Sequence, residues 1–542
     1  MSAAEHPDGQ EVFYEPPPGL PPDAEEAADG VANKMRSYLA RLVQDVRDYQ
    51  LTHGHVLKMV RFQNSYHVPS TGINVSLAPT PFPRRLYDEA VALQHCMNEL
   101  YIKAAADEAW LYSVLRPEIE GDKDGLLASL WDVHMKCKEA GSVQDVKCGL
   151  FRSDYMLHGN VDGNSRLKQV EMNTFSVAGG CHSERVSDMH GYLRRKRGYE
   201  QEGRELSAMQ MNLLPRNTNI ASMTAGLTAA HYKYLETHPK LADNPANTVL
   251  TCVLMVVQPL NFNVADERPI EYGLWEANVP CYRCEWHAIL AQTRLDENRH
   301  LIFMPAGSST EFEVSVVYYK GGYDPAEYGP EADGKSTRLM LEMSYAIKCP
   351  DILTHLTTFK AVQQALAEPG VAESFLASPQ TVNQRAAVRD KFMPMYPLGA
   401  TPSGREARRL ATDPREVERY VLKPNLEGGG HNVFGSDIPD FLSGKPEDHW
   451  YKYILQRRIE PPTAITGALL MAEELYEGAV VSELGILGFV MWKQLPSGGN
   501  EVTNVETVRN EAAGWTFKTK PQEINEMSVV KGYGCFDCPL LV

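Results

Sequence analysis

The stretch KPNLEGGGHNVFG, at residues 423–435, combines a cation, a carboxylate, three consecutive glycines and an amide. The apolar run before it predicts a strand that carries Lys423, and the glycines let backbone amides approach an oxyanion because they have no Cβ. Glu427 would repel bound phosphates unless a divalent cation lay between them, so it predicts Mg²⁺. No Lys-Ser or Lys-Thr pair follows the glycines, which excludes a Walker loop. Taken alone, the stretch fits a flexible Gly-rich turn between two strands equally well.

A second supplier of metal ligands is predicted upstream. The segments 149–156 and 168–174 have strand patterns, and the turn between them contains Asp-Gly, so together they predict a β-hairpin. Alternation along the second strand places Glu171 and Asn173 on one face, where both side-chain oxygens could bind one cation. A Glu-x-Asn pair on an exposed strand is common without a metal. A carboxylate from elsewhere in the chain, such as Glu427, favours the metal site.

The composition is that of a large globular protein without a cationic surface. At 542 residues, with 43% hydrophobic and 23% charged residues, the chain is expected to form more than one domain. A net charge of −17 argues against nucleic acid as a partner, because phosphate backbones need a dense cationic face. No apolar run approaches the ~20 residues of a membrane helix, so no membrane partner is expected. The acidic, Pro-rich residues 1–30 predict a disordered leader, and we expect a cytoplasmic protein.

The ten cysteines of this chain are expected to be reduced thiols, because no secretion signal is apparent. Two Cys-x-x-Cys pairs, Cys281/Cys284 and Cys535/Cys538, have the spacing of a four-thiolate zinc site. The first pair lies in an aromatic stretch and the second at the end of the chain. Separate thiols are therefore the favoured interpretation.

The middle of the chain predicts a small parallel α/β unit. Apolar runs at 249–257 and 312–319 read as strands buried on both faces and separated by helices. Asn261, Asn263 and Lys320 follow or end these strands, where such sheets bind ligands.

The last part of the chain contains a candidate anion site. Residues 480–492 have the pattern of a pair of strands with Glu483 near its start. Lys518 and Lys520 share one face of a further strand and would bind an anion together. On these residues alone, a solvated lysine pair is the favoured interpretation.

Five motifs resemble eukaryotic-type glutathione synthetase, an ATP-grasp ligase. They occur in the order found in that family, over roughly residues 35–542. The motifs are RSDYM at 152–156, VEMNTFS at 170–176, KCPDI at 348–352, VLKPNLEGGGHNVFG at 421–435 and SELGILG at 482–488.

The resemblance implies a mixed α/β (α+β) fold and an ATP-dependent ligase. ATP would drive the joining of γ-glutamylcysteine to glycine through an acyl phosphate, with release of ADP and phosphate. The protein would be a cytoplasmic homodimer. The chain would divide into the leader, an ATP-grasp main domain at 31–246, 350–397 and 479–542, an inserted substrate-binding α/β domain at 247–349, and a glycine-rich lid at 398–478.

The resemblance also implies a role for each site residue. Arg152 and Lys520 would be catalytic, and two Mg²⁺ ions would be held by Glu171, Asn173 and Glu427. ATP would be bound by Glu171, Lys360, Lys423, Gly428, Gly429, Gly430, Asn432, Phe434, Gln456, Arg457, Ile459, Glu483 and Lys520. The peptide and glycine would be bound by Arg152, Ser176, Asn261, Asn263, Glu267, Lys320, Tyr323, Lys518, Glu526, Val529 and Val530.

The chain departs from the family pattern in the predicted peptide and amine pockets. Lys320 stands where better-known members have Arg, which keeps the charge but loses bidentate carboxylate recognition. The other departures are Glu267 for Gln, Lys518 for Arg, Phe434 for Tyr, Ala178 for Ser, and the loop 528–532 in place of a glycine-alanine loop. Two alternatives follow: a ligase that uses β-alanine or another small amine in place of glycine, and a non-catalytic nucleotide-binding protein.

Overall fold

The computed structural model describes residues 38–62, 66–159, 165–199, 213–238, 249–329, 332–379, 381–399, 401–426, 431–463, 465–472, 474–495 and 505–542. The predicted leader and four predicted site residues, Glu427 and Gly428 to Gly430, lie outside these ranges. The fold is a mixture of helices and several sheets, as expected. Within the described ranges, no helix has both the length and the apolar character needed to cross a membrane.

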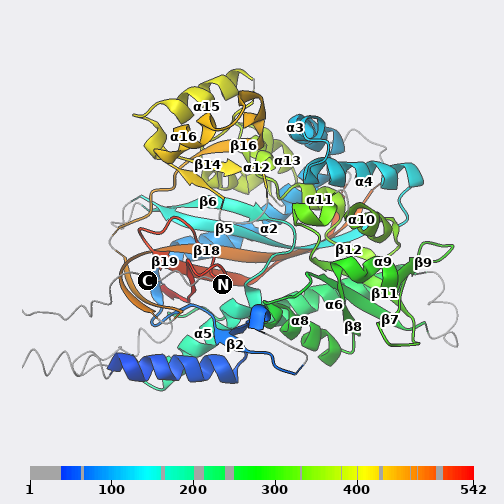
Figure 1. Ribbon diagram of the computed structural model, residues 1–542, viewed down its shortest axis with the longest axis horizontal. Helices are drawn as coiled ribbons and strands as arrows, with labels where there is room; N and C mark the ends of the chain where they lie inside the picture. The colour runs from blue at the N-terminus through cyan, green and yellow to red at the C-terminus, as the bar shows by residue number, and fades with distance from the viewer. Residues whose placement is uncertain are drawn as a thin grey trace, which may run out of the picture.

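A seven-stranded sheet forms the centre of the molecule (Figure 1). Its order is β17-β3-β20-β19-β18-β5-β6. The strands are β3 (Val75–Ser76), β5 (Val146–His158), β6 (Arg166–Asn173), β17 (Thr466–Met471), β18 (Glu474–Gln494), β19 (Val505–Pro521) and β20 (Cys535–Phe536). The predicted hairpin is confirmed, since β5 and β6 pair antiparallel. The predicted strand pair at 480–492 is wrong, because these residues belong to one strand, β18, which pairs with β19 from Val480 and with β5 from Glu483.

The two faces of β18 have different neighbours. Leu484 and Ile486 pack on the face covered by α2 (Arg84–Ala106), and a Cβ at Gly488 would lie 2.5 Å from the Asn98 side chain of that helix. On the opposite face, Leu487 and Phe489 pack with residues of α6 (Asn219–Thr237). Val481 and Glu483 share this second face with Gly485, which has no side chain, and both line a cavity. This end of the strand is therefore open to a ligand.

A six-stranded sheet occupies the predicted inserted unit. Its strands are β7 (Thr251–Val257), β8 (Cys281–Glu285), β9 (Thr293–Leu295), β10 (Leu301–Phe303), β11 (Phe312–Lys320) and β12 (Ile347–Cys349). β8, β7, β11 and β12 are parallel, whereas β10 and β9 add an antiparallel hairpin, so the sheet is mixed rather than purely parallel. α6 and α8 (Val264–Glu276) pack against it, and α10 (Gly334–Met343) contacts β11 through Arg338, whose guanidinium lies 4.1 Å from the centre of the Tyr319 ring.

The cysteine pairs do not form one zinc site. Cys281 and Cys284 are three residues apart on β8 and pack in two different hydrophobic clusters. Cys535 and Cys538 belong to two further clusters. Nine of the ten thiols are buried, which fits small apolar side chains in cores.

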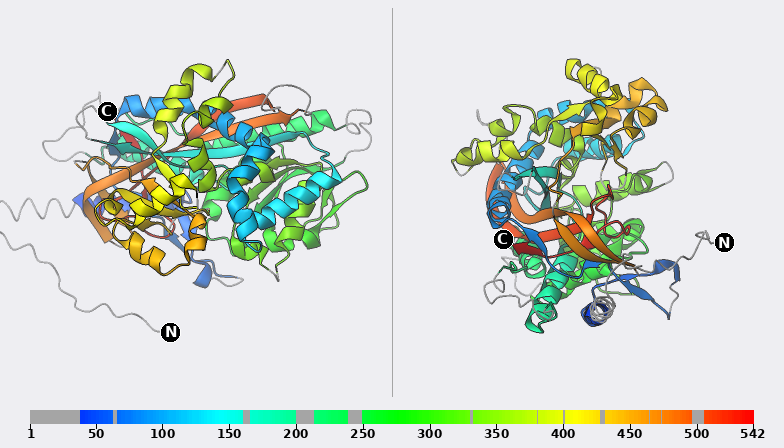
Figure 2. Two further views of the ribbon diagram at one scale, coloured as in Figure 1. Left: turned by 90° about the horizontal axis from the view of Figure 1, so that it is seen from above. Right: turned by 90° about the vertical axis from the view of Figure 1, so that its left-hand side faces the viewer.

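A four-stranded antiparallel sheet with the order β13-β16-β14-β15 carries the glycine stretch. Its strands are β13 (Met395–Pro397), β14 (Tyr420–Pro424), β15 (Val433–Phe434) and β16 (Tyr453–Arg457), and its flanking helices are α15 (Pro402–Thr412) and α16 (Asp437–Ser443). In Figure 1 and in the right-hand view of Figure 2 this unit lies above the β5–β6 hairpin. β17 lies in the seven-stranded sheet although it falls within the predicted lid, and the domain boundaries stay a prediction.

The remaining described elements connect these layers. The chain turns at Asp107 after α2, and the side chain of Asp107 caps the helix that follows. Residues 38–52 are helical. The others are α3 (Glu108–Gly121), α4 (Leu126–Ala140), α5 (Gly180–Arg195), α9 (Ile289–Gln292), α11 (Ile352–Leu356), α12 (Lys360–Leu366), α13 (Val371–Phe375), α14 (Arg385–Lys391), β1 (Val56–Lys58), β2 (Ser70–Gly72), β4 (Thr80–Phe82) and β21 (Pro539–Leu541).

Candidate active site

Strand register brings the predicted charged residues onto one face of the central sheet. Arg152 on β5 is paired with Asn173 on β6, and Asp154 with Glu171. The next two strands of the sheet after β5 are β18 and β19, and Glu483 on β18 is opposite Lys518 on β19. These pairings place residues from four chain segments side by side, because cross-strand partners project from the same face of a sheet.

Arg152 is held in a fixed orientation by Asp154. Its Nε donates to Asp154 Oδ1 at 2.7 Å and its Nη2 to Oδ2 at 2.8 Å, while its Nη1 donates to the Ala178 carbonyl at 2.7 Å. Burial opposes the charge on Arg152, but Asp154 holds the pKa of the guanidinium above its ordinary value. Sequence reasoning missed Asp154. The signal was its position two residues after Arg152, which puts both on one strand face.

Glu171 is an ionised carboxylate among cations. Lys360 Nζ lies 3.6 Å from Glu171 Oε2. Burial would raise the pKa of Glu171, but Lys360 and Lys423 lower it to about 2. Asn173 donates its amide N–H to Asp154 Oδ2 at 3.1 Å, a bond that does not use the amide oxygen. A carboxylate and an amide oxygen on one face are a donor set that fits Mg²⁺.

Two further lysines of this site, Lys423 and Lys520, have pKa values lowered by burial. Burial lowers the pKa of Lys423 to about 8 and that of Lys520 to about 8. Lys423 Nζ donates to the Val170 carbonyl at 3.1 Å, and Lys520 Nζ donates to the Ile524 carbonyl. A bound phosphate would favour the charged form of both lysines, because each would gain an anionic partner.

Glu483 and Lys518 form a close ion pair at 2.5 Å. Burial raises the pKa of Glu483, and the Lys518 ammonium opposes this shift. The pair lies beside Arg152, so this side of the site contains both signs of charge.

A cavity of about 350 Å³ lies between this sheet face and the four-stranded sheet. The predicted site residues that line it are Arg152, Glu171, Asn173, Lys423, Asn432, Phe434, Gln456, Arg457, Ile459, Glu483, Lys518, Lys520 and Glu526. Lys360 does not line the cavity. Its Nζ forms an ion pair with Glu171, which does, and donates to the Leu426 carbonyl at 2.7 Å. The predicted nucleotide residues that the structure describes therefore lie together.

The predicted peptide-binding residues form a second group at the ends of β7 and β11. Asn261 donates to Glu267 at 2.6 Å, and Arg283 contacts the same carboxylate at 2.6 Å. Burial raises the pKa of Glu267, although Lys320 and Arg283 oppose the shift.

The loop after β6 connects this second group to the cavity. Lys320 Nζ donates to the Val177 carbonyl of that loop at 2.6 Å, and the next carbonyl along, Ala178, binds Arg152. Ser176 in the same loop has a φ of 49°, a conformation that costs energy for a residue with a Cβ. The last three predicted residues do not line the cavity: Tyr323 follows β11, Val529 packs in a hydrophobic cluster, and Val530 is exposed.

Known proteins are similar to this chain over nearly its whole length. Residues 36–541 match the family model described as eukaryotic glutathione synthase, ATP binding domain. The glutathione synthetase large chain of Schizosaccharomyces pombe is 34% identical, over 91% of this chain and 96% of that protein. The glutathione synthetase of Homo sapiens is 29% identical, over 93% and 97% respectively.

A solved structure has the same overall fold. It is the apo form of a glutathione synthetase-like effector from Globodera pallida, which superposes with a TM-score of 0.66 at 22% identity and covers 93% of this chain and 97% of that one. The family match, the relatives and the converging site residues lead to one conclusion. This chain belongs to the eukaryotic glutathione synthase family.

Proposed function

We propose that this protein joins γ-glutamylcysteine to glycine at the expense of ATP, forming glutathione, ADP and phosphate. The observation that carries the proposal is the meeting of Arg152, Glu171, Lys423 and Lys520 in one cavity, since they come from four different strands. Family membership gives the reaction, and the cavity supplies the charges that it needs.

The reaction has two steps. A carboxylate oxygen of γ-glutamylcysteine attacks the γ-phosphorus of ATP, and the bond from that phosphorus to ADP breaks. The amine of glycine then attacks the acyl carbon, phosphate leaves with the electrons of the C–O bond, and the amine loses a proton. Negative charge accumulates in both steps, so fixed cations contribute more than an acid and base pair.

The nucleotide would lie between the two sheets. Lys360 and Lys423 would contact its phosphates, and Gln456, Arg457 and Ile459 its adenine. Phe434, Asn432 and Glu483 would complete this pocket, and the four-stranded unit with Gly428, Gly429 and Gly430 would act as a lid that excludes water from the acyl phosphate.

The acyl group would be phosphorylated next to Arg152. Because Asp154 binds the Nε–Nη2 edge of that guanidinium and the Ala178 carbonyl binds Nη1, Arg152 is preorganised to stabilise the tetrahedral intermediate. Lys520 would stabilise the transferred phosphate. The peptide would extend from there toward Lys320 and Asn261 and past Ser176, with Lys518, Glu526, Val529 and Val530 around the amine.

Mg²⁺ is part of this proposal. Glu171 and Asn173 fit as ligands, and Glu427 is proposed as the third from the sequence. Two bound Mg²⁺ ions would neutralise phosphate charge in the transition state. The family sequences also lead us to propose a homodimer in the cytosol, which light scattering and localisation of a tagged chain would test.

The test is turnover with purified full-length protein. We expect stoichiometric ADP, phosphate and glutathione from ATP, γ-glutamylcysteine and glycine, with none formed without Mg²⁺. β-Alanine and other small amines are run in parallel. Turnover with another amine but not glycine would contradict the proposed amine substrate, and ATP binding without ADP release would indicate a binding protein.

A further inference from the structure

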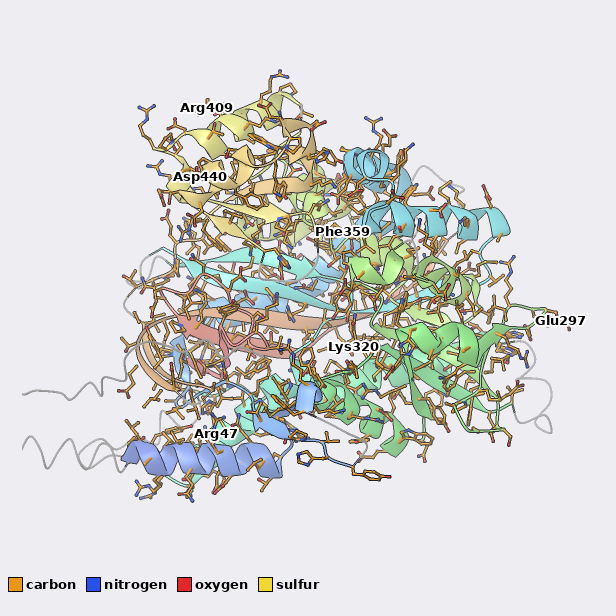
Figure 3. The ribbon with its side chains drawn as sticks, in the orientation of Figure 1. Arg47, Glu297, Lys320, Phe359, Arg409 and Asp440 are labelled. Atoms are coloured by element: carbon orange, nitrogen blue, oxygen red, sulfur yellow. The ribbon has the colours of Figure 1, made fainter. Side chains whose placement is uncertain are left out.

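A cluster of buried side chains lies at the far end of β11 from the proposed active site. Glu313 is near the start of this strand, His238 is the C-cap residue that follows α6, and His300 precedes β10. Lys320, which ends the same strand, is seven residues from Glu313, or about 23 Å at about 3.3 Å per residue. Figure 3 shows Lys320 near the centre of the molecule and Glu297, three residues before His300, at its right-hand edge.

The three side chains direct potential ligand atoms to one point. His238 Nε2 is 3.0 Å from His300 Nε2 and 3.2 Å from Glu313 Oε1. All three atoms lie within 4.8 Å of one another. Within the ranges that the structure describes, this is the one group of three or more His, Cys, Asp or Glu side chains arranged closely enough to hold a metal ion.

The surrounding residues orient these ligands. Asp296 Oδ2 lies 2.9 Å from His300 Nδ1, and Asp296 Oδ1 accepts from the His300 backbone N–H at 2.8 Å. When Nδ1 carries the proton and donates to Asp296, the lone pair of Nε2 faces the cluster, as in carboxylate–histidine–zinc arrangements. Tyr234 donates its hydroxyl to Glu313 Oε1 at 2.6 Å and holds that carboxylate in place.

We propose that His238, His300 and Glu313 bind a Zn²⁺ ion that ties α6 and the β9–β10 hairpin to β11. Zn–N bonds of about 2.0–2.1 Å at tetrahedral angles place ligand atoms about 3.3 Å apart, close to the separations found here. Two imidazoles and a carboxylate suit Zn²⁺ better than Mg²⁺, which prefers oxygen ligands and retains water. The site is structural in position, because it holds together three segments and touches no residue of the proposed reaction.

The competing explanation is a cluster held by hydrogen bonds alone. The Nε2–H of His238 can donate to His300 Nε2, and the Nδ1–H of His300 can donate to Asp296. Glu313 accepts a hydrogen bond from Tyr234. This arrangement satisfies the same groups without a metal, so metal content decides between the two.

The experiment measures Zn²⁺ bound by the full-length chain. The protein is stripped with a chelator and titrated with ZnCl₂ in the presence of excess Mg²⁺ and ADP, which occupy the oxygen-rich nucleotide site. Metal is then counted by mass spectrometry after gel filtration. We expect one equivalent of Zn²⁺ per chain, an increase in Tm on binding, and a tetrahedral absorption spectrum when Co²⁺ replaces it.

Three variants test the ligands. His300→Asn keeps an amide near the position of Nδ1, where it can bind Asp296, but has no group in the place of Nε2. This variant is expected to bind no stoichiometric Zn²⁺. Glu313→Gln keeps the side-chain volume and an oxygen that can accept from Tyr234. It is also expected to bind no stoichiometric Zn²⁺. Asp296→Asn should weaken Zn²⁺ binding by about 10–100-fold while leaving the ligands present.

His231→Asn is the matched control. His231 is also buried on α6 and its ring bonds Ser315 on β11 at 2.7 Å, so the variant makes a similar change seven residues before His238. This control variant should still bind one equivalent of Zn²⁺ per chain. The proposal is overturned if the wild-type chain binds no stoichiometric Zn²⁺ under these conditions, or if Glu313→Gln binds as much as the wild type. The wild-type measurement decides the matter alone if a variant does not fold.

Discussion

Arg152 and Asp154, two residues apart on β5, form a bidentate ion pair with N–O distances of 2.7 and 2.8 Å on the sheet face that lines the cavity. The Asp154 side chain is 1% exposed and also accepts from Asn173 at 3.1 Å. One carboxylate thus positions both a proposed catalytic cation and a proposed metal ligand. Its effect on the reaction would be indirect, through these two neighbours.

Replacing this carboxylate should damage both stability and turnover. Asp154→Asn leaves Arg152 buried without its counter-charge, and loss of one partner of a buried pair costs about 3–5 kcal/mol. We expect a lower urea midpoint and a kcat reduced more than the KM for ATP is raised. The exposed pair Arg409 and Glu406 provides the control, because Glu406→Gln should change neither quantity. Wild-type kcat in folded Asp154→Asn would contradict the positioning role.

Glu171 is expected to be required in its ionised form. Its pKa of about 2 keeps it charged at all pH values at which the enzyme is assayed. Glu171→Gln should lower kcat by at least about 10²-fold, the scale found for loss of one preorganised charge-stabilising group. It should also raise the Mg²⁺ concentration needed for half-maximal rate. Glu368→Gln, at an exposed position after α12, is the control, and an unchanged Mg²⁺ titration of Glu171→Gln would refute the assignment.

Glu427 is tested in the same assay. Because it is proposed as the third Mg²⁺ ligand, Glu427→Ala should reduce Mg²⁺-dependent ADP release by orders of magnitude. Unchanged turnover would remove this residue from the metal site.

The two lysines with lowered pKa predict that ATP binding weakens as pH rises through about 8. Lys423 and Lys520 lose their protons there, and neutral amines attract phosphate less strongly. Calorimetric titration with MgATP from pH 7 to pH 10 checks this, with Lys423→Met expected to bind more weakly at pH 7 and to show a smaller pH dependence. A wild-type affinity that does not change over this interval would contradict the prediction.

The contribution of these lysines to folding stability has the opposite sign. Between their folded pKa of about 8 and their ordinary value of 10.5, the unfolded chain binds more protons than the folded chain. Their contribution to the free energy of unfolding therefore increases with pH in this window. Urea unfolding of wild type and Lys423→Met at pH 8 and pH 10 measures this contribution. The free energy of unfolding of the variant should increase less between pH 8 and pH 10 than that of the wild type.

Alanine substitutions at Gly485 and Gly488 are expected to differ in their effect on catalysis, because the two glycines face opposite sides of β18. At Gly488 a new Cβ would meet the Asn98 side chain at 2.5 Å on the α2 face, and overpacking of this kind costs about 1–3 kcal/mol. At Gly485 a Cβ would lie 2.5 Å from Asp154 Oδ1 and 2.3 Å from Thr516 Oγ1, on the cavity face. Both Gly→Ala variants should lower Tm, and only Gly485→Ala should also lower kcat. Equal kcat values would show that the cavity face tolerates the methyl group.

Local patterns in the sequence were sufficient for several elements. The β5–β6 hairpin and the shared face of Glu171 and Asn173 follow from two-residue alternation and turn chemistry, which depend only on neighbouring residues. The buried strands β7 and β11 were predicted from apolar runs for the same reason. Local alternation could not show that β18 is one continuous strand, because its length depends on partners on both sides.

What the sequence by itself determined is therefore the family, several of the longer strands and the residue types of the site. Only the tertiary structure decided that Asp154 holds Arg152 and Asn173, and that His238, His300 and Glu313 meet. The physical reason is the range of the interactions. Turns and alternation act over a few residues, whereas the pairing of distant strands and helices depends on which apolar faces are buried together in the folded chain.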